Sequence, residues 1–245
     1  DPPWSATFPK ELEAYNYPAY MAPREMGFRP QRSVRMLDED DSITFEELVA
    51  YKHSTRMELA DRILDDLIPL AIRQGGLARR AADVLDAWDR EADADSQGAV
   101  LFEAWAMELG MGPTMFQIPW DEANPRTTPD GLANPQAAVA ALVAVSGRIE
   151  ENYGALDVPW GEVYRFRLDD YDLPANGAPG ALGAFRAMSF EADGEQFRSV
   201  GGDTFVAAVE FSDPVRAEVL LSYGNATQPG SSHRGDQLEL LAEKE

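Results

Sequence analysis

The stretch Val163-Tyr164-Arg165-Phe166-Arg167-Leu168 decides the fold class, because apolar and polar side chains alternate along it. Alternation with a period of two is typical of a β-strand that buries one face. Four further strands are predicted over the ranges 185–190, 195–200, 204–211 and 217–223. Short turns rich in Gly and Pro separate these runs, which favours an antiparallel sheet.

Before this stretch the period is helical. Thr44-Phe45-Glu46-Glu47 fits a capping box, in which the threonine accepts from the first turn and Glu47 reaches back, so a helix should begin near Phe45. Apolar residues at helical spacing continue beyond it, with Pro69 as a kink or break and Gly75-Gly76 as a stop. One long helix or two short ones would fit this region.

More helices follow, and the segment before them is different. Apolar stripes predict helices over the ranges 77–88, 101–109 and 137–149. The stretch 111–135, rich in Pro, Gly and Asn, predicts a connecting loop. Helices first and strands later predict an α+β fold.

Three regions result from this pattern. Residues 1–41, which lack a clean period, are expected to form an extended segment with short helical turns at most. Residues 42–157 should be helical, and residues 158–245 should contain the strands and the start of a helix near the end of the chain. The first residues resemble neither an initiator methionine nor a signal peptide, so we expect a piece of a longer protein.

Charge and composition exclude several kinds of partner. The 43 acidic and 21 basic residues give a net charge of −22, which repels phosphate backbones and anionic lipids. Nucleic acid and membrane surfaces are therefore not expected as partners. The chain has no cysteine, which excludes disulfides and a thiol nucleophile, and no apolar run approaches the roughly 20 residues that span a bilayer.

The residues themselves contain no strong catalytic pattern. His53 and His233 lack a second histidine or an acidic partner at metal-ligand spacing, so a structural role is favoured for both. A Ser-His-Asp triad stays open, although no Gly-x-Ser-x-Gly elbow is present. The acidic run 38–41 lacks the glycine and closing glutamate of a calcium loop, and the glycines of 177–183 have the wrong spacing for a dinucleotide turn. A solvated approach to a helix and a tight loop between strands are the favoured interpretations.

Several stretches taken together resemble one known family. They lie in the same order and at the same spacing as in the large subunit of the penicillin acylase family, in the branch of acyl-homoserine-lactone and aculeacin-type acylases. The stretches are Asp1-Pro2-Pro3-Trp4, Tyr17-Pro18-Ala19-Tyr20-Met21, 29–37, 49–62, 157–163, Gly201-Gly202-Asp203-Thr204 and 222–233. The resemblance covers nearly the whole chain.

This resemblance implies an N-terminal-nucleophile hydrolase with an αββα core, of which the chain would be an incomplete piece. Such a precursor cuts itself and frees a serine whose own amine acts as the general base against an amide carbonyl. The serine, the oxyanion-hole asparagine that should immediately precede Asp1, and the small (alpha) subunit would all lie outside this chain. We expect no cofactor, an N-acyl small molecule as substrate, and a periplasmic or secreted location. Because Met21 to Pro23 stand where some relatives hold an acidic calcium ligand, we also expect no metal site.

One catalytic-site residue is implied within the chain. Arg32 matches a family arginine that orients the oxyanion-hole asparagine, and its rigid planar fork of donors suits that role. Arg29 is the alternative if the alignment shifts by one helical turn, and an ordinary surface arginine is the simpler interpretation. The competing function is a non-catalytic relative that binds or scaffolds after losing the nucleophile.

Overall fold

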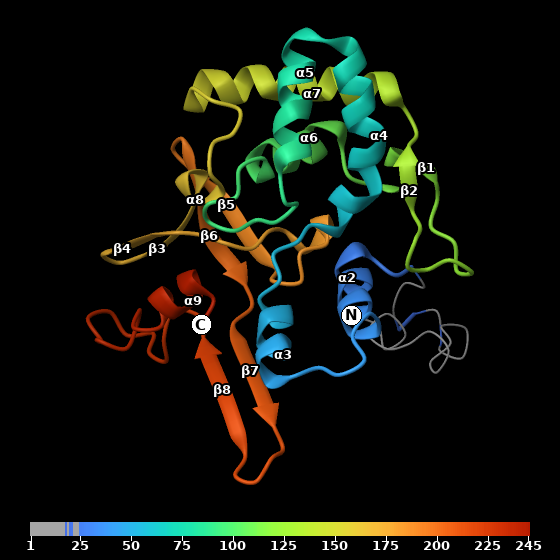
Figure 1. Ribbon diagram of the computed structural model, residues 1–245. Coiled ribbons are helices and arrows are strands. Elements are labelled where there is room, and N and C mark those ends of the chain that lie inside the picture. Colours follow the sequence, from blue (N-terminus) through green and yellow to red (C-terminus); the bar gives the residue numbers. More distant parts are fainter. Residues whose placement is uncertain (1–17, 19, 22–24) are drawn as a thin grey trace.

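The computed structural model describes residues 18, 20, 21 and 25–245 (Figure 1). Helices α4 to α7 pack together at one end of the molecule, a four-stranded sheet lies in the middle, and a separate hairpin projects from the other end. Helices occupy the first part of the chain and most strands the second, so the α+β prediction is confirmed.

Helix α2, Phe28–Asp38, corrects the prediction that residues 1–41 are extended, as far as that segment is described. Pro30 hid the helix in the sequence, but it lies in the first turn, where backbone N–H groups have no intrahelical acceptor to lose. Val34 and Met36 are buried, and α2 packs on α4. Tertiary packing therefore stabilises a helix that the local sequence signals only weakly.

Helix α3, Phe45–Lys52, begins where the capping box predicts. The Thr44 hydroxyl accepts from the Glu47 N–H at 3.2 Å, and the Glu47 carboxylate accepts from the Thr44 N–H at 2.8 Å. Both bonds of the box are present, so this prediction is confirmed in detail.

Four further helices enclose most of the core. They are α4 Glu58–Gln74, α5 Gly76–Ala87, α6 Ala99–Leu109 and α7 Pro135–Tyr153. Pro69 lies inside α4 without ending it, and Gly75, at a φ of +75°, separates α4 from α5 as expected. Trp105 and Phe102 of α6 are fully buried, and the Trp105 indole donates to the Ala138 carbonyl of α7 at 2.9 Å.

The connection before α7 is more ordered than a loop. It contains the 3-10 helix η2, Pro113–Met115, and the short strands β1, Phe116–Ile118, and β2, Asp130–Leu132, which pair antiparallel. Strands of three residues give no readable alternation in a sequence, which is why they escape prediction.

The central sheet has the order β4-β3-β6-β5. After the short helix α8, Trp160–Val163, its strands are β3 Tyr164–Leu168, β4 Tyr171–Pro174, β5 Met188–Asp193 and β6 Gln196–Gly202. β3 and β6 pair in parallel and the other pairs are antiparallel, so the predicted all-antiparallel sheet is only partly correct. Strand β4 was not predicted.

The last two predicted strands form a sheet of their own. β7, Phe205–Glu210, and β8, Arg216–Leu221, pair antiparallel next to α3, and α9, Leu238–Glu243, follows them (Figure 1). The 3-10 helix η3, Gly180–Leu182, occupies the glycine-rich segment before β5. Within the described ranges, no helix combines the length and the hydropathy of a membrane span.

Candidate functional site

Helix α2 carries three arginines on successive turns, and the structure gives each a different environment. Arg29, Arg32 and Arg35 all project from a helix that is fixed by its buried residues Pro30, Gln31, Val34 and Met36. Gln31 provides one such contact, since its amide donates to the Met26 carbonyl at 2.8 Å and to the Thr128 carbonyl at 3.0 Å. The helix therefore holds the arginines in a defined position.

Arg35 is committed to an ion-pair network. Its Nη2 lies 2.8 Å from Oε1 of Glu58, which is fully buried, and Arg62 donates to the same oxygen at 2.8 Å. A buried carboxylate requires such compensation, because a single unpaired charge in the interior is costly. Arg35 is therefore a structural residue that neutralises Glu58.

Arg29 is held by the segment that leads into β5. Its Nε donates to the Phe185 carbonyl at 3.1 Å, and its guanidinium lies 5.0 Å from the centroid of the Phe185 ring. Asp203 lies 3.7 Å from Nη2 and also binds Lys52. The Gly-Gly-Asp-Thr stretch thus supplies a carboxylate that links α2, α3 and the end of β6.

Arg32 differs from both neighbours. No hydrogen bond or ion pair joins its guanidinium to any residue that the structure describes, and its Nε is inaccessible to solvent. Burial lowers the pKa of Arg32 and the Glu58 carboxylate opposes this shift, but the guanidinium stays charged at neutral pH. A half-buried arginine without a partner has donors available for a group from elsewhere.

Arg32 lines a polar cavity of about 440 Å³. The cavity also contains Tyr51, His53, Glu91 and Lys244, and it lies between α2, α3 and the end of α9. Burial, followed by the nearby carboxylates of Asp93 and Asp89, raises the pKa of Glu91. Cationic and anionic groups therefore share one partly desolvated space around the Arg32 guanidinium.

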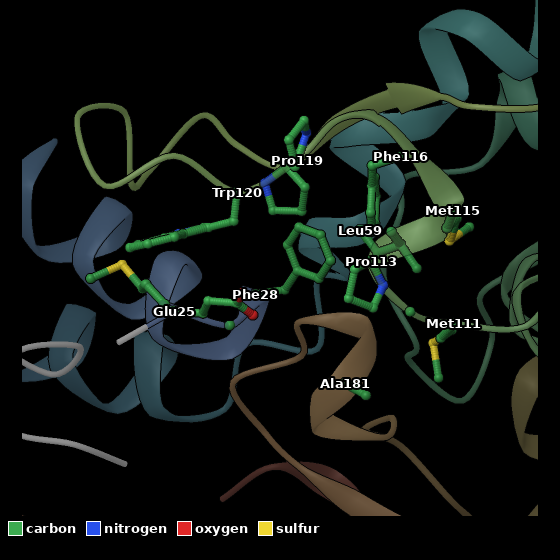
Figure 2. A pocket seen from close by; sticks show the side chains of 14 residues that line it. Glu25, Phe28, Leu59, Met111, Pro113, Met115, Phe116, Pro119, Trp120 and Ala181 are labelled. Atoms are coloured by element: carbon green, nitrogen blue, oxygen red, sulfur yellow. The ribbon is translucent and has the colours of Figure 1, made fainter. Parts of the chain in front are cut away.

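A second cavity, of about 320 Å³, lies at the start of α2 and is largely apolar. Figure 2 shows the rings of Phe28, Phe116 and Trp120 gathered around it, with Met111 and Met115 nearby. The Phe28 and Phe116 rings are 5.7 Å apart, and the indole N–H of Trp120 is buried without a hydrogen-bond partner among the described residues. This cavity was not predicted, because its walls come from α2, α4 and the η2–β1 connection, which lie far apart in the sequence.

His53 has the structural role that was favoured for it. Its Nδ1 accepts from Arg186 Nη1 at 2.6 Å, and Arg186, only 1% exposed, also donates to Asn176 and to the Leu241 carbonyl of α9. Burial and the nearby Arg186 lower the pKa of His53 to about 4, so the ring is neutral at pH 7. Burial also lowers the pKa of Arg186 to about 10. The pair attaches α9 to the rest of the molecule.

The other predicted features have no site geometry. His233 is exposed, and its Nδ1 lies 2.8 Å from the carboxylate of Asp236, an acidic partner that was not predicted. In the acidic run, Asp40 accepts from the Ser42 N–H and the Tyr51 hydroxyl, while Asp38 pairs with Arg126. Across the described part of the chain, no cluster of three or more His, Cys, Asp or Glu side chains could hold a metal.

The segment 177–183 is the predicted tight loop between strands. Gly183 has a φ of +96°, and a β-carbon there would lie 2.7 Å from the Glu58 backbone nitrogen. The loop can therefore pack against the start of α4 only with glycine at this position.

Part of the expected site lies outside the described residues. Asp1 to Trp4, next to which the oxyanion-hole asparagine is expected, is not described, and neither are Ala22 and Pro23 of the segment where relatives hold calcium. The sequence did not predict the roles of Arg186 and Trp120. The one sequence signal for Arg186 is that an arginine stands inside an otherwise apolar, strand-like run.

Comparison with known proteins gives a consistent picture. The sequence model of the penicillin amidase family matches residues 3–245. An acyl-homoserine lactone acylase PvdQ of Pseudomonas putida is 28% identical over all of this chain and 32% of its own length. Proteins of the same name from Pseudomonas savastanoi pv. phaseolicola and Pseudomonas syringae pv. tomato are 29% and 28% identical over 85% of the chain and 28% of their own lengths.

The chain spans about a third of the length of these relatives. The family match nevertheless extends from residue 3 to residue 245 and so includes helix α2, helices α4 to α7 and the strands. The chain therefore belongs to the penicillin amidase family, and within it to the acylase branch.

Proposed function

We propose that this chain is part of a hydrolase that removes the acyl group from N-acyl amides, with an N-terminal serine outside these residues as the nucleophile. Family membership supports an amide substrate, and the names of the relatives support acyl-homoserine lactones, with lipopeptides or penicillin-type amides as further members of the class. A periplasmic or secreted location and a small subunit cut from the same precursor belong to this proposal.

The observation that carries the proposal for this chain's own part in the reaction is that the guanidinium of Arg32 has no partner among the described residues. Amide hydrolysis places negative charge on the carbonyl oxygen in the transition state, and fixed donors around that oxygen supply much of the catalysis. Arg32 can hold the side-chain oxygen of an asparagine and turn its N–H donors toward the oxyanion. Its charge adds positive potential where the negative charge develops.

The environments of the three arginines support Arg32 over its neighbours. Arg35 is occupied by Glu58, and Arg29 by Phe185 and Asp203. Arg32 is a positioning residue in this proposal, because it acts through the asparagine and need not touch the substrate.

The test is a comparison of Arg32→Lys, Arg29→Lys and Arg35→Lys in the longer family protein that contains this chain. Lysine keeps the charge but loses the planar fork, so Arg32→Lys should lower the acylation rate by roughly ten- to a thousandfold, with KM for the N-acyl amide little changed. Because Arg32 has no partner to lose among the described residues, the melting temperature should stay close to that of the wild type. Arg35→Lys should lower the melting temperature instead, because the buried Glu58 carboxylate loses the pair of hydrogen bonds that Nε and Nη2 of Arg35 donate to it.

Near-wild-type turnover of Arg32→Lys would refute the role given to Arg32. A larger loss in Arg29→Lys at unchanged stability would transfer that role to Arg29. Absence of hydrolysis in the wild-type longer protein would favour the non-catalytic relative.

A further inference from the structure

Glu58 is a buried carboxylate of which only one oxygen is hydrogen-bonded within the described part of the chain. It lies in the first turn of α4, and its side chain is fully buried. Its Oε1 accepts from Arg35 and from Arg62, each at 2.8 Å. Its Oε2 has no hydrogen-bond partner among the described residues. A buried charged oxygen without a donor is costly, so the negative charge on this side of Glu58 is available to a cation nearby.

The surroundings of Glu58 fix the position of this charge. A β-carbon on Gly183 would lie 2.5 Å from the Glu58 β-carbon, so the η3 loop packs directly against the first turn of α4. From the side of α2, Arg35 donates to the carboxylate from Nε at 3.2 Å and from Nη2 at 2.8 Å. Glu58 therefore presents a fixed negative charge to helix α2.

Arg32 lies next to this charge. Arg32 and Arg35 are three residues apart on α2, and side chains at this spacing are neighbours on the surface of a helix. Burial lowers the pKa of Arg32, the Glu58 carboxylate opposes this more strongly than any other charge, and the cations Arg56 and Arg35 add to the lowering. The attraction of Glu58 thus acts against the repulsion of two neighbouring cations.

We propose that Glu58 is a second positioning residue of the reaction, which holds the Arg32 guanidinium in place for the oxyanion-hole asparagine. No hydrogen bond to a described residue orients Arg32, so the charge of Glu58 takes the place of a direct partner. Without that charge, Arg32, Arg35 and Arg62 would be three cations around a neutral side chain, and their repulsion would displace Arg32. This role rests on the proposed function of Arg32.

A double-mutant cycle in the longer family protein tests the role of Glu58. Glu58→Gln keeps the size of the side chain and removes its charge. It should lower kcat for a long-chain N-acyl homoserine lactone by roughly tenfold or more, with KM little changed, because Glu58 does not touch the substrate. In the Arg32→Lys background the same change should lower kcat by less than about threefold, because Glu58 acts through Arg32.

Asp61→Asn is the matched control. Asp61 also lies in the first turn of α4 and pairs with two arginines, Arg56 at 2.8 Å and Arg90 at 2.6 Å. Asp61→Asn should lower the melting temperature, because two arginines lose their carboxylate, but kcat should stay within about threefold of the wild type.

An equal loss of kcat for Glu58→Gln in both backgrounds would identify a purely structural role and overturn the proposal. Near-wild-type kcat of a folded Glu58→Gln would overturn it as well. If the melting temperature shows that Glu58→Gln does not fold, Glu58→Asp, which withdraws the charge by one methylene, takes its place in the cycle. Equal losses in both backgrounds, or no loss, would overturn the proposal there too.

Arginine labelling distinguishes this role from the proposed function, because labelling needs no activity. The longer protein is treated with phenylglyoxal, and the labelled peptides are quantified by mass spectrometry, with the exposed Arg198 of β6 as the reference. Relative to Arg198, Arg32 should react at least about fivefold faster in Glu58→Gln than in the wild type, and at the wild-type rate in Asp61→Asn. An unchanged rate at Arg32 in Glu58→Gln would refute the role of Glu58 alone. Faster labelling in Glu58→Gln, together with a wild-type protein that hydrolyses no amide, would refute the proposed function and with it the part of Glu58 in the reaction, while the hold of Glu58 on Arg32 would stand.

Discussion

The buried pair of His53 and Arg186 predicts a loss of stability in mild acid. The pKa of His53 is lowered from 6.5 to about 4 in the folded chain, by burial first and then by the charge of Arg186, with smaller contributions from Lys52 and Lys244. Asp203 opposes the shift. A base whose pKa is depressed binds fewer protons when folded, so its contribution to stability is complete above pH 6.5 and is lost as the pH falls toward 4.

The magnitude follows from the difference between the two states. A pH of 5.0 lies about 1.5 units below the pKa of the unfolded imidazole, which is therefore mostly protonated, whereas the folded imidazole is still almost neutral. This difference lowers the free energy of unfolding by about 2 kcal/mol. His53 lines cavities that reach solvent, and screening there reduces the expected effect to about 1 kcal/mol. Because the sequence pI is about 4.3, the chain still carries a net negative charge at pH 5.0, which favours solubility.

The assay is urea unfolding of the 245-residue chain at pH 7.5 and pH 5.0, followed by tryptophan fluorescence at low micromolar concentration. The wild type should lose about 1 kcal/mol more than His53→Gln between the two pH values, because other titrating groups such as Glu91 are common to both proteins. His233→Gln, at the exposed histidine, is the matched control and should follow the wild type. An equal pH dependence in the wild type and His53→Gln would refute the reasoning.

Two further predictions concern backbone geometry. Gly183→Ala should lower the free energy of unfolding by at least about 2 kcal/mol, because alanine is strained at a φ of +96° and its β-carbon meets the Glu58 backbone. Gly147→Ala, in the open middle of α7, should instead raise the free energy of unfolding by about 0.5–1 kcal/mol. Urea unfolding of both variants checks this contrast, and equal effects would contradict it. Thr44→Ala should lower the free energy of unfolding by about 1 kcal/mol through loss of the capping box, whereas Ser42→Ala should leave it nearly unchanged. An unchanged free energy of unfolding in Thr44→Ala would show that tertiary contacts alone stabilise α3.

Features determined by neighbouring residues could be predicted from the sequence. The start of α3 follows from Thr44 and Glu47, which lie within one turn and bond directly to each other. The alternation of 163–168 likewise gives β3, because one residue in two meets the core. Features determined by distant contacts could not be predicted. Helix α2 depends on packing against α4, and the parallel pairing of β3 with β6 is set by the whole sheet.

The candidate site divides in the same way. Family resemblance, not residue chemistry, singled out Arg32 from several arginines in the same segment. That Arg32 has no partner within the described ranges is visible only in three dimensions. Arg186 has three partners that are between 10 and 133 residues away, so its role as the anchor of α9 could not be read from any local pattern.

The central proposal is that this chain is part of a serine amidase whose nucleophile lies elsewhere in a longer precursor. The most direct measurement is release of free homoserine lactone from a long-chain N-acyl homoserine lactone, compared between the self-cleaved longer protein and the purified 245-residue chain. The longer protein should turn the amide over continuously, and the 245-residue chain should show no hydrolysis above background, because removal of a nucleophile costs many orders of magnitude in rate. Turnover by the 245-residue chain that disappears when one of its own serines is replaced by alanine would contradict the account.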